Sequence, residues 1–137
     1  MKKVLLLFCF ILGILITSSA EGMVDIYTGT LEDGDEQLES GEYIDTITYS
    51  VGEGDAISVF LRSEDFDTYL ILIMPNGEQF DNDDIDESDT NSGLTMSASE
   101  TGQMQIIVTS SAVGEIGDYE VTIIVEPEYD VFEDEEE

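Results

Sequence analysis

Apolar and polar residues alternate over long stretches of the chain, with a period of two. Between Tyr43 and Val51, the odd positions Tyr43, Ile47, Tyr49 and Val51 are apolar, and the even positions are mostly Thr or Ser. Alternation of this kind places every second side chain on the same face of an extended segment. It therefore predicts a strand over 43–51 with one buried face.

Turn-forming residues separate this segment from others of the same kind. Gly52–Asp55 and Pro75–Gly77 are typical of turns, and the apolar, branched run 68–74 is typical of a strand that is buried on both faces. Further strands are predicted at 23–31, 57–62, 78–81, 94–96, 103–109 and 119–125. Because no segment shows a sustained helical period, we expect an all-β fold: an antiparallel two-sheet β-sandwich of jelly-roll type with about eight strands.

The first twenty residues follow a different pattern. Lys2 and Lys3 precede the apolar run 4–16, and small residues at 18–20 follow it. This order is typical of a secretory signal peptide, and the run is shorter than the ~20 residues that a spanning helix needs. Residues 1–20 are therefore predicted to be removed, together with Cys9. The remaining chain is expected to be secreted, to the periplasm or the exterior, and not inserted in a membrane.

The C-terminal residues are also set apart by composition. Eight of the twelve residues in 126–137 are acidic, and such a segment buries too little apolar surface to repay the entropy of ordering. We therefore expect a sandwich domain over 21–125 and a solvated acidic tail over 126–137.

Composition excludes several classes of function. The chain of 137 residues has 33 Asp and Glu against 3 Lys and Arg, a formal net charge of -30, one Cys and no His. Histidine-based catalysis and histidine-bound zinc are therefore excluded, and so large a negative charge disfavours nucleic-acid partners. We predict that the protein is not an enzyme. A carboxylate-based hydrolase stays as an alternative, although no Asp-Thr-Gly motif occurs.

Several motifs occur in the order of a known module. They are Gly41-Glu42-Tyr43-Ile44-Asp45, Gly54-Asp55-Ala56-Ile57-Ser58-Val59, Phe66-Asp67-Thr68-Tyr69-Leu70, Pro75-Asn76-Gly77, Asn82-Asp83-Asp84 and Gly117-Asp118-Tyr119-Glu120-Val121. Over about residues 30–125 the chain resembles the bacterial pre-peptidase C-terminal domain, a β-sandwich attached to secreted peptidases and similar to collagenase collagen-binding domains. One departure is Gly102-Gln103-Met104, where the family usually has an aromatic residue in place of Met.

The resemblance implies an accessory, non-catalytic role. Members of this family bind an extracellular polymer, a surface or a partner protein beside a secreted peptidase, and some bind calcium. The alternative, from another class, is an acidic structural protein of the cell exterior that gathers cations.

Acidic residues on both sides of the Pro75–Gly77 turn are candidate calcium ligands. If the strands around this turn pair as a hairpin, their outer ends approach, and clustered oxygen ligands suit Ca²⁺. The spacing does not match an EF-hand. The candidates are Asp65, Asp67, Asn82, Asp83, Asp84 and Asp86, with Asp89 nearby. Asp67 and Asp83 have an alternative role, because Asp side chains also cap turns by accepting bonds from backbone amides.

Two further features have both a functional and a structural interpretation. The acidic segment 32–36, with Glu39, either gathers a cation or is a solvated linker. Phe60 alternates with the apolar positions of 57–61, so it is either an exposed aromatic contact or is covered by a neighbouring element.

Overall fold

The computed structural model describes residues 22–128, and this part of the chain is all β. Its nine strands are β1 (Met23–Leu31), β2 (Glu36–Gln37), β3 (Tyr43–Val51), β4 (Ala56–Arg62), β5 (Thr68–Ile73), β6 (Gln79–Asn82), β7 (Ser92–Ser97), β8 (Gly102–Ser110) and β9 (Gly117–Glu126). No helix in this range is long and apolar enough to cross a bilayer. The predicted signal peptide and tail residues 129–137 lie outside the described residues.

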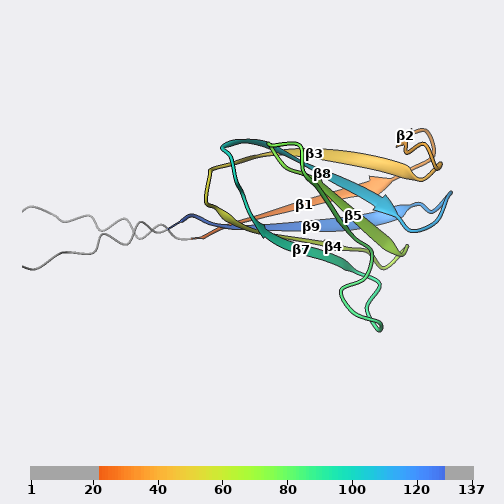
Figure 1. Ribbon diagram of the computed structural model, residues 1–137. Coiled ribbons are helices and arrows are strands. Elements are labelled where there is room, and N and C mark those ends of the chain that lie inside the picture. The colour runs from red at the N-terminus through yellow and green to blue at the C-terminus, as the bar shows by residue number, and fades with distance from the viewer. Residues whose placement is uncertain (1–21, 129–137) are drawn as a thin grey trace, which may run out of the picture.

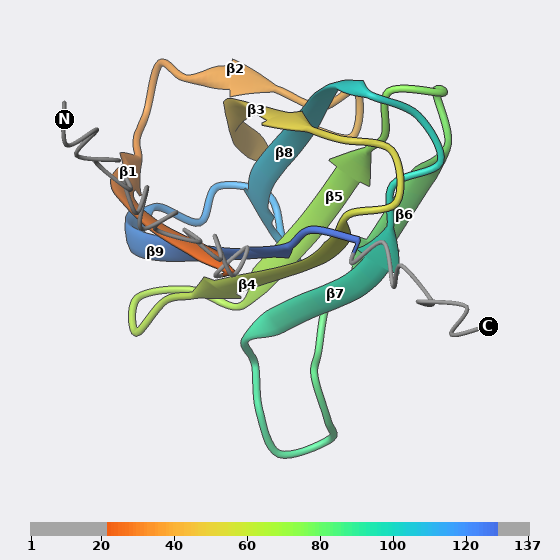
Figure 2. The ribbon, with the colours of Figure 1, turned by 90° about the vertical axis from the view of Figure 1, so that its left-hand side faces the viewer.

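The strands form two antiparallel sheets that face each other (Figures 1 and 2). One sheet has the order β1-β9-β4-β7, and the other has the order β2-β3-β8-β5-β6. The chain crosses repeatedly from one sheet to the other, so that strands close in sequence lie apart in the sheets. With β2 set aside, four strands in each sheet and this alternating order are those of a jelly roll. The predicted fold class is confirmed.

Each predicted strand segment corresponds to an observed strand, and the differences lie at the ends and in one short element. The strand that the sequence missed is β2, where Glu36 and Gln37 pair with Ile44 and Tyr43. Two residues are too few to show a period, so alternation predicts no strand in this acidic segment. Strand β9 also continues through Glu126, which pairs with Ala56, one residue beyond the predicted end of the sandwich.

The core is built from the residues that alternation placed inside. Ile57, Val59 and Leu61 of β4 are fully buried, as is Met104 of β8. Met104 therefore fills its core position without an aromatic ring. Strand β5 is buried on both faces in its middle, at Leu70, Ile71 and Leu72, whereas Tyr69 and Ile73 are only partly buried.

Two tyrosines connect the sheets by hydrogen bonds to carboxylates. The hydroxyl of Tyr49, on β3, donates to Asp25 on β1, and that of Tyr119, on β9, donates to Asp45 on β3 at 2.7 Å. Burial, with the bond to Asp25 next, raises the pKa of Tyr49 to about 12. Burial and Asp45 likewise raise the pKa of Tyr119 far above the ordinary range. Both hydroxyls therefore stay protonated and hold the two layers together at neutral pH.

The two ends of the sandwich differ. Segments 32–42, 63–67, 83–91 and 111–116 connect strands at one end, which we name the loop end. Both ends of the described chain lie at the opposite end, with the turns near Gly54, Pro75 and Ala98. In Figure 1 the loop end lies on the right. The topology thus collects segments that are far apart in sequence.

Candidate functional site

The loop end carries most of the acidic residues of the described chain. Segment 32–42 has six, 63–67 has three, and 83–91 has five. The turns at the opposite end have only Glu53, Asp55, Glu78 and Glu100. Because these groups converge on one end, their fields add there. Within the described residues the loop end is therefore the more acidic end, although Glu126 and Glu128, where the acidic segment 126–137 begins, lie at the opposite end.

Several of the predicted calcium ligands have structural roles in loops. The carboxylate of Asp65 accepts a bond from the backbone amide of Asp118 at 2.8 Å, and the amide oxygen of Asn82 accepts from Gly93 at 3.1 Å. The backbone carbonyl of Asp83 accepts from the Ser92 hydroxyl at 2.7 Å. These bonds connect the loop end to the ends of β7 and β9.

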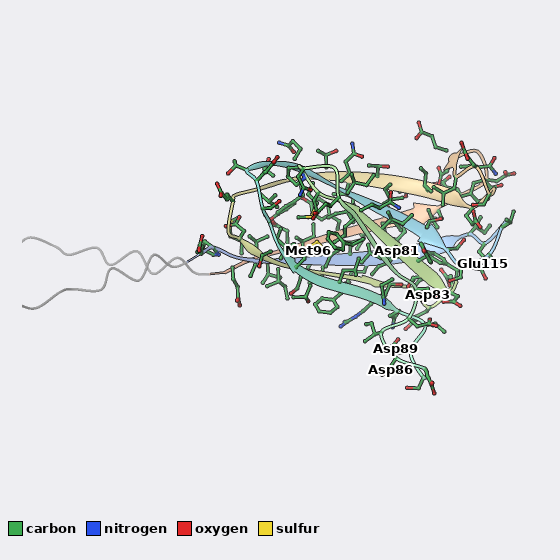
Figure 3. All side chains as sticks on the ribbon, viewed as in Figure 1. Asp81, Asp83, Asp86, Asp89, Met96 and Glu115 are labelled. Atoms are coloured by element: carbon green, nitrogen blue, oxygen red, sulfur yellow. The ribbon has the colours of Figure 1, made fainter. Side chains whose placement is uncertain are left out.

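Asp86 and Asp89 stabilise the tip of the 83–91 loop. The carboxylate of Asp86 accepts from the amide and the hydroxyl of Ser88, and that of Asp89 accepts from the amide of Asn91 at 2.9 Å. The bonds from Ser88 lower the pKa of Asp86. Figure 3 shows both residues on the loop that projects from the sandwich. Turn capping by acidic side chains is thus observed at Asp86 and Asp89, whereas the sequence suggested it for Asp67 and Asp83.

The expected convergence of carboxylates also occurs. Desolvation raises the pKa of Asp84, and Asp83, Asp67, Asp89 and Asp86 add repulsion in that order. One oxygen of Asp67, Oδ1, is buried and has no hydrogen-bond partner within the described residues. The hairpin around Pro75–Gly77 therefore brings these segments together, as predicted.

Convergence does not by itself make a calcium site. Within residues 22–128, no group of three or more acidic side chains is arranged to hold a metal ion. Four of the side chains in this region already accept hydrogen bonds from backbone amides: Asp65, Asn82, Asp86 and Asp89. Calcium binding by these residues therefore stays a prediction.

Exposed apolar side chains lie among the acidic loops. In segment 111–116, Val113 is 62% exposed and Ile116 is 54% exposed, and Ile85 of the 83–91 loop is 45% exposed. Val113 packs near Gly41, where a Cβ would lie 3.4 Å from its side chain. Sequence reasoning missed these residues because single apolar residues in loops show no period. Apolar contacts ringed by charge are typical of protein interfaces.

An open groove of about 860 Å³ lies beside the loop end, on the outer face of the four-stranded sheet. Thr28 and Thr30 of β1, Asp118 of β9 and Arg62 of β4 line it. Arg62 is the only cation among residues 22–128 and lies opposite Glu120 in the register. Acidic residues surround it, so the groove does not favour an anion.

Phe60 lies on the same outer face as Arg62. Its ring covers Gly93 on β7, where a Cβ would lie 2.9 Å from Cδ1 of the ring. The side chain is half-buried, so a neighbouring strand covers it in part. Phe60 is therefore not a free aromatic platform.

Comparisons with known proteins show a similar fold but do not identify a family. No family model matches the chain, and no curated protein shows significant sequence similarity to it. Its structure is similar to that of PliG from Salmonella Typhimurium, with a TM-score of 0.53, 15% identity, and coverage of 75% of this chain and 87% of that one. PliG from Aeromonas hydrophila gives a TM-score of 0.53, 12% identity and coverage of 79% and 89%. Both are described as periplasmic inhibitors of g-type lysozyme. At these identities the likeness shows the fold alone.

Proposed function

We propose that this protein is a secreted, non-catalytic binding protein whose loop end recognises a basic protein. The observation that carries this proposal is that exposed Val113 and Ile116 lie next to two acidic segments: Val113 lies beside Gly41 of 32–42, and Gly117, which follows Ile116, lies against Asp65 of 63–67. A leader-like segment at 1–20 supports secretion. The two similar folds, both described as periplasmic inhibitors, support a protein partner and a role without catalysis.

The physical roles of the two kinds of residue differ. A directional negative field steers a cationic partner and raises its association rate, and salt reduces this effect. Exposed apolar side chains exclude water once the surfaces meet and slow dissociation. Val113 and Ile116 lie in one short loop, so a single partner surface can cover both.

The first test is direct binding of the secreted chain to an immobilised g-type lysozyme and to a panel of basic secreted proteins, at low and high NaCl. We expect retention that weakens with salt. Replacing three exposed loop-end acids, D83N/D84N/E87Q, should slow association roughly tenfold. The matched control, E53Q/E78Q/E100Q, removes the same charge at the opposite end and should change association little.

A second pair of variants tests the apolar contacts. V113S/I116S should speed dissociation, whereas V24S, on β1, should not. Equal effects of the two charge variants would show non-specific attraction, and would contradict a site at the loop end. Absence of retention on every basic protein tested would count against the whole proposal.

Membership of the pre-peptidase C-terminal family and its polymer-binding role stay predictions. The motif residues Phe66, Thr68 and Leu70 are buried, so they support the sandwich and leave the target undefined. Retention of the chain on collagen, chitin or cellulose, with no retention on basic proteins, would favour that role instead. The alternative, an acidic protein of the cell exterior that gathers cations, predicts retention neither on these polymers nor on basic proteins.

A further inference from the structure

Strand β1 forms an unusual sheet edge. The four edge strands in the described chain are β1, β7, β2 and β6, and they have nine, six, two and four residues. An edge strand has a row of backbone N–H and C=O groups without a strand partner, so proteins usually shorten it or protect it with charge or proline. β1 is the longest of these four, and the other long edge is residues 45–51 of β3, which β2 leaves unpaired on one side.

The side chains of β1 do not protect this edge. Met23 is 58% exposed, Val24 59%, Ile26 61% and Tyr27 39%. The strand contains neither proline nor lysine, and its single acid, Asp25, accepts the Tyr49 hydroxyl. In a chain of net charge -30, this apolar and nearly uncharged edge is where another acidic molecule meets the least repulsion.

We propose that β1 pairs antiparallel with the β1 of a second copy of this chain. A two-fold axis at Tyr27, the central residue of the strand, places Ile26 opposite Thr28 of the second copy and Asp25 opposite its Gly29. No acid then faces an acid, and like charges directly opposite are what destabilises a strand pair. The two four-stranded sheets become one sheet of eight strands.

The antiparallel direction also separates the charged ends. The loop end lies at the Leu31 end of β1, where Leu31 pairs with Gly117. In the antiparallel pair, the two loop ends point in opposite directions and lie far apart, and each lies beside the Met23 end of the other copy, where Glu126 is the nearest described acid. Parallel pairing, or pairing through the loop end, would bring them together. A second copy therefore fits this edge in one orientation.

Strand addition by an unrelated extended peptide is the other use of such an edge. The symmetric charge pattern favours the second copy. In the two-fold pair, Asp25 of each β1 lies opposite Gly29 of the other, and the two Tyr27 residues lie opposite each other. The inference does not rest on the proposed function. The dimer leaves both loop ends free, so its failure and the failure of partner binding are distinguishable.

Sedimentation equilibrium of the secreted chain over a concentration series tests the association. We expect a monomer–dimer equilibrium that shifts toward the dimer as NaCl rises, because salt screens the repulsion between two acidic copies. Y27E places two carboxylates opposite each other at the axis. Its dimer Kd should be at least about fourfold higher than that of Y27Q, in which an uncharged side chain of the same shape as Glu replaces Tyr27. The control pair T48E and T48Q, on the exposed face of β3, should differ little.

A cysteine placed on the axis tests the register. In an antiparallel pair, residues directly opposite have Cα atoms about 4.5–5.5 Å apart, within the range of a disulfide. In a C9S background, which removes the only cysteine of the chain, Y27C should oxidise to a covalent dimer much faster than T28C or T48C. Thermal melts followed by circular dichroism establish that each variant is folded.

Two outcomes overturn the proposal. One is a chain that stays monomeric at about 1 mM in high salt, where even a contact with a Kd of 1 mM would be populated. The other is a dimer in which Y27E matches Y27Q and Y27C oxidises no faster than T48C. That second result would place the interface elsewhere.

Discussion

The hydrogen bond between Tyr119 and Asp45 joins the two sheets, and its removal should cost measurable stability. In Y119F the ring stays and only the hydroxyl is lost. The Asp45 carboxylate, which accepts that hydroxyl at 2.7 Å in a part-buried position, then loses this donor. A second Tyr–Asp bond supplies a matched control, because Tyr43 donates to Asp33 at the same distance in an exposed position.

The expected magnitude follows from burial. A hydrogen bond to a charged group contributes about 1.5–3 kcal/mol, and the half-buried position of Asp45 favours the lower figure. We therefore expect Y119F to lower the free energy of unfolding by about 1.5 kcal/mol, which is about 6 °C in Tm for a domain of this size. Y43F should change stability by less than about 0.5 kcal/mol, because water replaces the lost donor.

Urea unfolding at pH 7, followed by circular dichroism, measures both variants against the parent chain. D45N keeps an acceptor for the Tyr119 hydroxyl, and the double variant Y119F/D45N completes a cycle that isolates the pair. If Y119F and Y43F lose the same stability, burial does not set the strength of these bonds. The explanation of how the sheets are held together would then be wrong.

Three other expectations concern pH, packing and salt. The pKa of Tyr49 is raised to about 12, above the value of about 10 that an exposed tyrosine has, so folded chains retain a proton that unfolded chains release. Urea midpoints should be steady below pH 10 and fall from pH 10 toward 12, and Y49F should flatten that fall. G29A should destabilise the fold by about 1–3 kcal/mol in urea unfolding, because a Cβ there overlaps the hydroxyl end of Tyr119; an unchanged midpoint would show that the ring moves freely. Scanning calorimetry should show Tm rising with NaCl through screening of the acidic loops, and a flat Tm would contradict this; the predicted calcium site requires a further rise with CaCl₂ at equal ionic strength.

The sequence alone predicted the strands and most of the core. Alternation is a local property, because adjacent side chains of a strand must point to opposite faces. The buried faces of β4 and β8, and the two-sided burial of β5, could therefore be read from consecutive residues. Only β2, with two residues, was too short to carry such a signal.

The candidate site was only partly predictable. Segments 63–67 and 83–91 were expected to approach each other, and the Ser63 amide donates to Asn91 Oδ1 at 3.2 Å. However, several of their side-chain oxygen atoms accept hydrogen bonds from backbone amides. Sequence spacing cannot show which donor an oxygen atom will bind. The exposed Val113 and Ile116 gave no pattern to read, since a loop has no period.

Tertiary structure decided which strands are neighbours, and function depends on that choice. Tyr119 and Asp45 are 74 residues apart in sequence, and only the packing of β9 against β3 brings them together. The same packing places four loops, three of them rich in acidic residues, at one end, and leaves β1 at an edge. Alternation determines the face that a side chain occupies, but the partner across the sheet or the core depends on how both layers pack as a whole. The sequence thus determined which side chains are buried, and the packing of the two sheets determined which exposed side chains lie close together.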